Sequence, residues 1–362
     1  MACERTGGGR AQTRRRSRPG ADRCALFQPY RGSGPEPVGF LLVPRFSMMA
    51  FISAVEPLRV ANRFAGRTLF SWHIFSADGG PVEASNGMSL AAEAAVDKAA
   101  VPTLIVCAGF DPRAQGKKPL IATLRRLAHR GVTLGALDTG AHLLARAGLL
   151  DDSRVTMHWE AVPAFREDFP DIEVSDELFE IGNGHFTCAG GTAAIDLMLD
   201  MIARKHGSEL AVKISEQFIH ERIRDRHDAQ RLKLAKRLGV TNSRVIRIVE
   251  LMERHLDEPL SARRLASSAG VSGRQLERLF RANLGVTPGA YYLGLRLQRV
   301  RQLLRETDKS VLEIALACGF TSASSVSRAY RARFGVAPSQ DRKEERDGGG
   351  PQRPAIAAER RP

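Results

Sequence analysis

The sequence predicts two folded domains: an α/β domain in which helices cover both faces of a parallel sheet, followed by an all-α domain. Between residues 37 and 220, short apolar runs alternate with helical patterns, an order of elements that builds such a sheet. After residue 220 the strand pattern disappears, and helical periodicity continues to residue 334. Residues 231–340 hold 20 Lys and Arg against 8 Asp and Glu, which indicates a polyanionic partner for this part.

Four apolar runs predict the strands, and four amphipathic stretches predict helices. The runs cover residues 38–43, 70–77, 103–108 and 132–138, and the helical stretches cover residues 53–65, 117–130, 139–147 and 192–206. Parallel sheets bind ligands beyond the carboxyl ends of their strands. The third run ends just before Gly109, and the fourth ends at Asp138, which Thr139 follows. We therefore expect a ligand site where these two strand ends meet.

Three further segments have the composition of tails and linkers. Residues 1–36, which are basic, and residues 341–362 are rich in Gly, Pro and Arg without apolar periodicity, which predicts disorder. The highly charged residues 221–242 predict a connecting helix and linker between the α/β domain (37–220) and the all-α domain (243–340). The side chains of this linker are expected either to be solvated or to contact a partner directly.

Cysteine usage and hydropathy indicate the cellular compartment in which the protein is expected. The five cysteines form no Cys-x-x-Cys pair, which excludes a zinc ribbon and suits a reducing cytosol. No apolar run is long enough to span a membrane, and none follows the first arginines as a secretory signal requires. Those arginines are compatible with an organellar transit peptide, but the rest of the chain favours a cytoplasmic protein. His142 and His158 lack a second ligand at metal-binding spacing, so we expect neither a metal nor a cofactor.

The all-α part contains an internal repeat. Residues 265–270 recur at 314–319, with Leu or Ile, Ala and Gly at matching places, and after one inserted residue 278–288 recur at 328–338. Each copy predicts a helix, a Gly-containing turn and a second helix, the arrangement of a helix-turn-helix. Packing of three helices without any binding role is the alternative, and the concentrated positive charge disfavours it.

The first turn of each second helix carries the candidate DNA-binding residues, because a helix-turn-helix places that turn against base edges. Ser272 and Gln275 predict a capping box in the first copy, and Thr321 or Ser322 caps the second. Arginine and glutamine bind base edges in bidentate fashion, whereas Ser and Ala suit phosphate contact, so we expect more base readout from the first copy. The predicted residues are Ser272, Gly273, Arg274, Gln275 and Arg278 in the first copy and Thr321, Ser322, Ala323, Ser324, Ser325 and Arg328 in the second.

A single helix is predicted to join the two copies over residues 290–306. Its apolar face is expected to consist of Leu293, Leu297, Val300 and Leu304. A rigid helix of this kind would hold the two copies about one DNA turn apart, roughly 34 Å.

These motifs resemble the AraC/XylS family of transcription regulators over residues 243–342. The resemblance rests on RRLASSAGVSGRQLERLFRANLGVTPGAYY, the joining helix, and VLEIALACGFTSASSVSRAYRARFGVAPS. It implies a bipartite domain that binds double-stranded promoter DNA and activates transcription, commonly by contacting RNA polymerase. A homodimer is expected as well, because paired regulators bind paired half-sites.

The α/β domain resembles the ThiJ/PfpI, or class I glutamine amidotransferase-like, fold, which is flavodoxin-like. The motifs that carry this resemblance are LIVCAGFDP (104–112), GALDTGAHLLARAGLLD (135–151) and TCAGGTAAIDLML (187–199). Enzymes of this fold place a cysteine nucleophile where this chain has Asp138, so we expect a retained pocket without catalysis. An enzyme that uses Asp138 is the alternative. With either function, Asp138 is expected to cap the helix that starts at Thr139, and Cys107 to be a buried small residue.

The predicted pocket combines carboxylates with aromatic rings, which is how proteins hold quaternary ammonium or guanidinium cations. Glu56 and Asp138 supply the carboxylates. Trp159 suits either the pocket or core packing, whereas Trp72 is expected in the core. The predicted ligand-binding residues are Phe46, Glu56, Gly109, Asp138, Thr139, His158 and Trp159.

A chain that combines these two domains resembles the GlxA-type regulators. The resemblance is to the subgroup that controls choline, glycine betaine and carnitine catabolism, which has arginine-responsive relatives. This resemblance implies a sequence-specific activator that responds to a small cationic nitrogen metabolite of the glycine betaine, dimethylglycine, carnitine or arginine class. Most GlxA-type proteins have a Gly-Pro-Leu-Glu turn where this chain has residues 56–59, Glu-Pro-Leu-Arg, so the role of Glu56 stays open. The alternative function is a constitutive DNA-binding regulator with a vestigial front domain.

Overall fold

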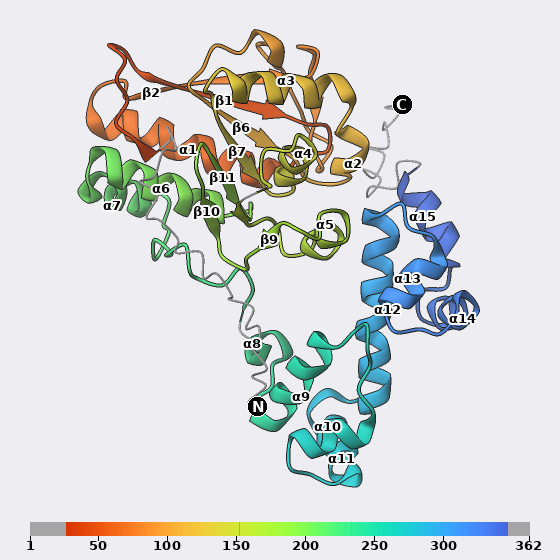
Figure 1. Cartoon of the computed structure of the whole chain (residues 1–362). Helices are drawn as coiled ribbons and strands as arrows, with labels where there is room; N and C mark the ends of the chain where they lie inside the picture. Colours follow the sequence, from red (N-terminus) through yellow and green to blue (C-terminus); the bar gives the residue numbers. More distant parts are fainter. Residues whose placement is uncertain (1–26, 152, 233, 347–362) are drawn as a thin grey trace, which may run out of the picture.

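The computed structural model describes residues 27–151, 153–232 and 234–346, and it contains the two predicted domains (Figure 1). The α/β domain is built on a seven-stranded sheet with the order β10-β11-β7-β6-β1-β2-β5. Neighbouring strands are parallel except for β10 and β11, which are antiparallel. The predicted fold class, a flavodoxin-like parallel sheet between helices followed by a helical domain, is therefore confirmed.

The four predicted strands correspond to β1, β2, β6 and β7, with ends within two residues of the prediction. The sheet strands are β1 (Glu36–Leu42), β2 (Phe70–Ser76), β5 (Ala94–Ala95), β6 (Thr103–Cys107), β7 (Thr133–Leu137), β10 (Phe179–Ile181) and β11 (His185–Cys188). Two small sheets pair β3 (Val82–Glu83) with β4 (Ser89–Leu90) and β8 (Arg154–Val155) with β9 (Glu173–Val174). The four predicted helices correspond to α1, α3, α4 and α6.

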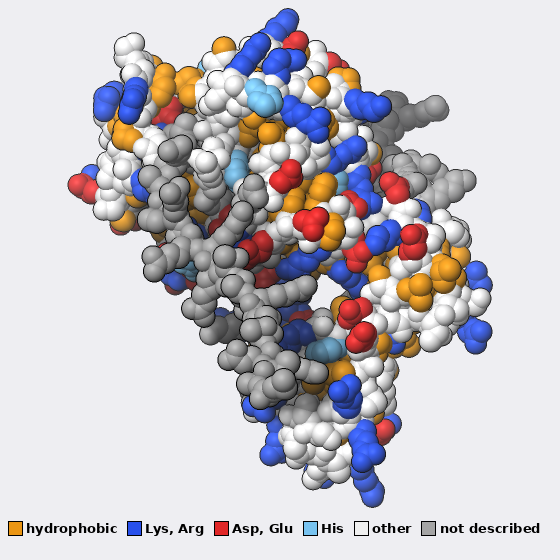
Figure 2. All heavy atoms as spheres, viewed as in Figure 1, with side chains coloured by type: hydrophobic (Ala, Val, Ile, Leu, Met, Phe, Trp, Pro, Cys, Tyr) orange, Lys and Arg blue, Asp and Glu red, His pale blue; other side chains and the backbone are white. Residues whose placement is uncertain are grey.

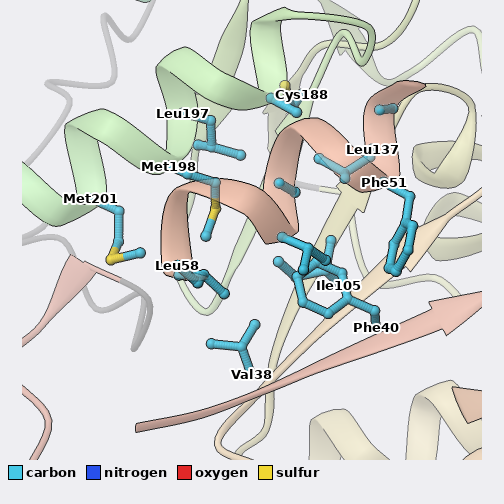
Figure 3. Close-up of a cluster of buried hydrophobic side chains, with 14 of the residues drawn as sticks. Val38, Phe40, Phe51, Leu58, Ile105, Leu137, Cys188, Leu197, Met198 and Met201 are labelled. Atoms are coloured by element: carbon cyan, nitrogen blue, oxygen red, sulfur yellow. The ribbon is translucent and has the colours of Figure 1, made fainter. Parts of the chain in front are cut away.

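Helices cover both faces of the sheet. One layer consists of α1 (Met48–Ala65), α6 (Ala193–His206) and α7 (Ser208–Gln217), and the other includes α3 (Lys118–His129), α4 (Gly140–Arg146) and α5 (Val162–Asp168), with the short α2 (Pro112–Gln115) beside α4. Successive residues of β1 point to opposite faces, so Phe40 packs beneath α1 and Leu41 beneath the other layer. Figure 3 shows the first of these cores, in which Val38, Phe40 and Ile105 of the strands face Leu58 of α1 and Met198 of α6.

The all-α domain holds two helix-turn-helix units on one long helix. The first unit comprises α8 (Leu234–Leu238), α9 (Ser243–Arg254), α10 (Ala262–Ser268) and α11 (Gly273–Leu284); α12 (Pro288–Glu306) joins it to α13 (Val311–Ala317), α14 (Ala323–Phe334) and α15 (Pro338–Arg346). Each unit has its own apolar core, and α12 contributes to both. The predicted joining helix is thus confirmed, although Leu293, expected on its apolar face, is 37% exposed. Leu303 takes its place in the core, because the buried face follows residues 297, 300, 303 and 304.

The connecting helix predicted within residues 221–242 is much shorter than that segment, since only α8 (Leu234–Leu238) is helical there. The chain has no helix between the end of α7 and Leu234, apart from the undescribed residue 233. Its polar groups bond to the α/β domain instead: the Leu178 N–H donates to the Arg226 carbonyl at 2.8 Å, and the Gln230 amide donates to Thr156 Oγ1 at 2.9 Å. We call residues 220–231 the strap, because they run along the surface of the α/β domain.

The predicted disorder of the tails is wrong at the residues that pack against the two domains. Phe27 is buried edge-to-face against Phe186, and Glu36 in β1 pairs with Lys205 at 2.6 Å. At the other end α15 extends to residue 346, and its buried Asp341 pairs with Arg301 of α12. Residues 1–26 and 347–362 lie outside the described residues, so the prediction for them is not tested. No helix in the described part of the chain is long and apolar enough to cross a membrane.

Candidate functional sites

The tip of β7 forms a sharp turn at Asp138. Its φ of 60° lies in the left-handed region, which Asp tolerates better than most side chains. The Asp138 N–H donates to the Cys188 carbonyl of β11 at 3.0 Å, and Gly190 lies so close that a Cβ there would be 2.8 Å from Asp138 Cβ. The end of β11 therefore fixes the turn.

The expectation that Asp138 caps the following helix is wrong. Helix α4 begins at Gly140 with Thr139 as its N-cap, and no side chain accepts a capping hydrogen bond there. Asp138 lies one residue outside the cap because β11 holds its backbone. The Thr139 hydroxyl donates instead to the Gly109 carbonyl at 2.6 Å, which ties the tips of β7 and β6 together.

Burial raises the pKa of the Asp138 carboxyl to about 7. The Ser47 hydroxyl donates a hydrogen bond to this carboxylate and opposes the rise in pKa, whereas the negative charge of Glu160 adds to it. Ser47 is also the N-cap of α1, where it accepts from the Ala50 N–H at 3.3 Å. Sequence reasoning missed both Ser47 and Glu160, although a Ser before a long helical pattern is a signal that could have identified the former.

The thiols near Asp138 are not activated nucleophiles. Cys107 is 1% exposed, as expected of a buried small residue, and burial raises the pKa of its thiol. Burial also raises the pKa of Cys188 to about 12. A catalytic thiol requires the opposite shift in pKa. Within the described residues, no group of three or more His, Cys, Asp or Glu side chains could hold a metal ion.

Most of the predicted ligand-binding residues lie around this turn. Phe46 is buried and forms β-bridges with Gly109 and Ala84, and the His158 N–H donates to the Asp138 carbonyl at 3.3 Å. Gly109 is required there, since a Cβ would lie 2.5 Å from the Arg45 carbonyl oxygen. The structure therefore brings together Phe46, Gly109, Asp138, Thr139 and His158.

Glu56 lies apart from this group. It is half-buried on α1, and its carboxylate pairs with Arg59 one helical turn later at 2.6 Å. The pair occupies the outer surface of the helix, where the Glu56 side chain remains 36% exposed. The structure gives no contact between Glu56 and the β7 turn.

Trp159 connects the turn to a cleft between the domains. Its ring lies 5.6 Å from the His158 ring and is 38% exposed, so it is not a core residue. Trp72, in contrast, is half-buried against the sheet core, as expected. The cleft, about 2320 Å³, is lined by Trp159, Glu160 and α5 on one side and by α9 and α12 on the other. Figure 2 shows this hollow between the α/β domain and the lower half of the all-α domain.

The second helix-turn-helix unit docks on the α/β domain through α5. Ala164 of α5 belongs to the apolar core that α12, α13 and α14 share, and Glu167 of α5 pairs with Lys309. Burial in this interface raises the pKa of Glu306, the last residue of α12, to about 8, and the charge of Glu160 adds to the rise. Glu160 is thus an electrostatic neighbour of both Asp138 and Glu306.

The predicted DNA-binding residues lie at the starts of α11 and α14. Ser272, Gly273, Arg274, Gln275, Arg278, Thr321, Ser324 and Arg328 are exposed, and Ser322, Ala323 and Ser325 are half-buried. Within the described residues no ion pair engages Arg274, Arg278 or Arg328, so their guanidinium groups are available to phosphates or bases. Figure 2 shows Lys and Arg side chains at the lower end of the molecule, where α10 and α11 lie.

Both predicted caps are present. Ser272 Oγ accepts from the Gln275 N–H at 3.2 Å, and Gln275 Oε1 accepts from the Ser272 N–H at 2.9 Å, which completes a capping box. In the second unit the cap is Ser322 rather than Thr321, since Ser322 Oγ accepts from the Ser325 N–H at 3.2 Å. The Gln275 side chain therefore stabilises the start of α11, and the same side chain would have to make the predicted contact with a base.

An α/β domain joined to two helix-turn-helix units with exposed arginines on their second helices defines a DNA-binding transcription regulator. Comparisons with known proteins agree with this class. The model of the DJ-1/PfpI family matches residues 38–204, and that of a helix-turn-helix domain matches residues 265–344. The chain belongs to the AraC/XylS family of transcription regulators, in the group whose members carry a DJ-1/PfpI domain before the helix-turn-helix domain.

The similar proteins are named as regulators. The chain is 56% identical to the HTH-type transcriptional regulator CdhR of Pseudomonas aeruginosa over 84% of this chain and 90% of that protein. It is 37% identical to the HTH-type transcriptional regulator GlxA of Rhizobium meliloti over 84% of this chain and 95% of that protein. A solved AraC family regulator from Pseudomonas putida is 30% identical, covering 51% of this chain and all of the other, with a TM-score of 0.46. The chain is accordingly a non-enzymatic regulator.

Proposed function

We propose that the α/β domain binds a small cationic nitrogen metabolite at the β7 turn and thereby controls how the all-α domain binds its promoter. The compounds considered are glycine betaine, dimethylglycine, carnitine and arginine. The observation that carries the proposal is the position of Asp138. A carboxylate replaces the usual thiol at the strand tip, next to a second carboxylate, Glu160, and an exposed indole, Trp159.

The electrostatics of this pocket favour a cation. Burial and Glu160 both disfavour the ionised form of Asp138, so a positive charge bound beside it would stabilise the carboxylate. A bound cation would supply that charge. The Trp159 ring adds an aromatic face, and the Arg231 guanidinium already lies 4.1 Å from its centroid, which supports its affinity for cations.

Three further parts of the proposal rest on the family. The regulator acts as an activator, it contacts RNA polymerase, and it binds promoter DNA as a homodimer in the cytoplasm. The exposed Arg274 and Arg278 of α11 and Arg328 of α14 support the contact with DNA, and dimerisation would let two chains bind paired half-sites.

Calorimetric titration of the full chain with glycine betaine, dimethylglycine, carnitine and arginine tests the proposal. We expect one of them to bind, and Asp138→Asn to weaken its affinity at least about tenfold, because a buried charge pair is lost. Asn is tolerated at positive φ, so the turn should persist. Glu56→Gln is the matched control, since Glu56 is a carboxylate outside the pocket, and it should leave the affinity unchanged.

Affinity should also rise with pH near neutrality. Because the pKa of Asp138 is about 7, a cation must displace a proton below that pH and none above it. If none of the four compounds binds at any pH and promoter affinity is the same with and without them, the cationic-effector proposal is refuted in favour of a constitutive regulator with a vestigial front domain.

A further inference from the structure

The strap is held on the α/β domain by contacts along its length. Arg224 forms an ion pair with the fully buried Asp196 at 2.7 Å, and His220 bonds the same carboxylate at 3.0 Å. Further along, Gln230 bonds Thr156. These contacts position the residue that follows them, Arg231, at the mouth of the cleft.

Arg231 lies between the two domains. Its guanidinium carbon is 4.1 Å from the centroid of the Trp159 ring, a close cation–π contact. Two carboxylates of the α/β domain, Glu160 and Asp176, act on its charge, and so do Glu253 of α9 and Arg237 of α8. Arg231 therefore occupies the aromatic face and the acidic surroundings that the proposed effector would use.

We propose that Arg231 is a tethered competitor of the effector: it occupies the Trp159 face when the pocket is empty, and the bound cation displaces it. This inference rests on the proposed function, since it names how that site is regulated. One ring face and its neighbouring carboxylate cannot hold two cations at van der Waals distance, so the effector and Arg231 exclude each other. Displacement of Arg231 would free the end of the strap.

The strap connects this event to DNA binding. Leu234, three residues after Arg231, is buried in the core of the first helix-turn-helix unit. The second unit is held separately, through α5 and α12. Loss of the Arg231 contact would therefore release the first unit while the second remains docked, and would let the two units adopt the spacing that DNA requires.

The first test needs no effector. Promoter affinity is measured by fluorescence anisotropy for the full chain and for Arg231→Gln, Trp159→Leu and the double variant. We expect each single variant to bind promoter DNA about two- to fivefold more tightly than the wild type without effector, as loss of one exposed cation–π contact implies. The double variant should match the single ones, because both changes remove the same contact.

Arg222→Gln is the matched control. Arg222 is another strap arginine, but it pairs with Asp228 within the strap at 3.1 Å and is 65% exposed. The control should leave promoter affinity unchanged. Equal effects of Arg222→Gln and Arg231→Gln would overturn the inference, because they would show a response to the lost charge rather than to the lost contact. So would additive effects of Arg231→Gln and Trp159→Leu.

The second test uses glycine betaine, carnitine and arginine as probes in calorimetry. Removal of the competitor should tighten binding of the responsive compound to Arg231→Gln about two- to fivefold and reduce the further effect of that compound on promoter affinity. An unchanged Kd would overturn the inference while the proposed function stands. If no probe binds wild type or variant but the DNA measurements are non-additive, the strap contact regulates DNA binding and the proposed effector class is wrong.

Discussion

The two helix-turn-helix units share one fold but differ in what surrounds them. In the first unit the start of α11 is exposed and carries Arg274 and Gln275, whereas in the second the start of α14 carries small residues, most of them half-buried. The first unit is joined to the α/β domain by the strap, whereas the second shares its apolar core with Ala164 of α5. From these differences we expect the first unit to recognise bases and the second to bind phosphates and to hold the α/β domain.

The largest expected effect comes from Arg274→Ala. An exposed arginine in the first turn of a recognition helix suits bidentate bonds to guanine, so its loss should cost about 1–3 kcal/mol of specific binding and little non-specific binding. The structurally equivalent residue of the second unit is Ser324, and Ser324→Ala should cost less and weaken all DNA sequences alike. Gel-shift titrations on promoter and scrambled duplexes measure both. A uniform loss for Arg274→Ala would assign it to a phosphate and remove this difference between the units.

The pH dependence of stability tests the docking of the second unit. The folded protein keeps Glu306 protonated up to about pH 8, whereas the ordinary pKa of a glutamate is 4.5. The folded state therefore binds the proton more tightly, and this contribution to stability is lost as pH rises from about 5 through 8.

Glu306→Gln carries no such charge. The difference in free energy of unfolding between this variant and the wild type should grow as pH rises from about 5 to 8, with a slope of at most about 1.4 kcal/mol per pH unit. The charges that face Glu306, namely Glu160, Arg299 and Arg113, are unchanged by the substitution. Denaturant unfolding at pH 6, 7 and 8 gives the comparison, and parallel curves for the two proteins would show that docking does not bury this carboxyl.

Gln275 sharpens the assignment of base recognition to the first unit. Because its side chain completes the capping box, Gln275→Ala should lower stability by about 1 kcal/mol as well as weaken promoter binding. Gln275→Glu separates the two effects: the carboxylate still accepts from the Ser272 N–H, but the amide donor is lost. We expect near wild-type unfolding and weaker promoter binding for Gln275→Glu. Normal promoter binding by this variant would restrict Gln275 to the cap.

Local sequence patterns predicted the strands and the helix-turn-helix caps, because these depend on neighbouring residues. The apolar runs gave β1, β6 and β7, and the Ser272–Gln275 spacing gave the capping box. The short β10 and β11 carry too few apolar residues to be recognised, and their pairing is set by the rest of the sheet. The strap has a helical charge pattern, but tertiary bonds to Asp196 and Thr156 outweigh it.

The ligand site was predictable only in part. Gly109 and Asp138 follow from strand order, since parallel strands end at one edge. Ser47, Glu160 and Arg231 come from a helix cap, a loop and the strap, and no local pattern brings them to the same place. Glu56 was placed in the pocket from its chemistry alone, but its pairing with Arg59 one turn later fixes it on the outer surface of α1.

The smallest expected effect comes from Lys309→Met, which removes the ion pair with Glu167 but keeps the apolar docking around Ala164. Partly exposed ion pairs contribute less than about 1 kcal/mol, so promoter affinity without effector should change by less than about fivefold. The matched control is Lys213→Met, whose partner Glu209 lies on the same helix, α7, and which should have no effect. Since the strap and the α5 contact hold different units, Lys309→Met and Arg231→Gln should have additive effects on promoter affinity. Strong non-additivity, measured by anisotropy on the double variant, would mean that both units leave the α/β domain together and would contradict the expected division of tasks between them.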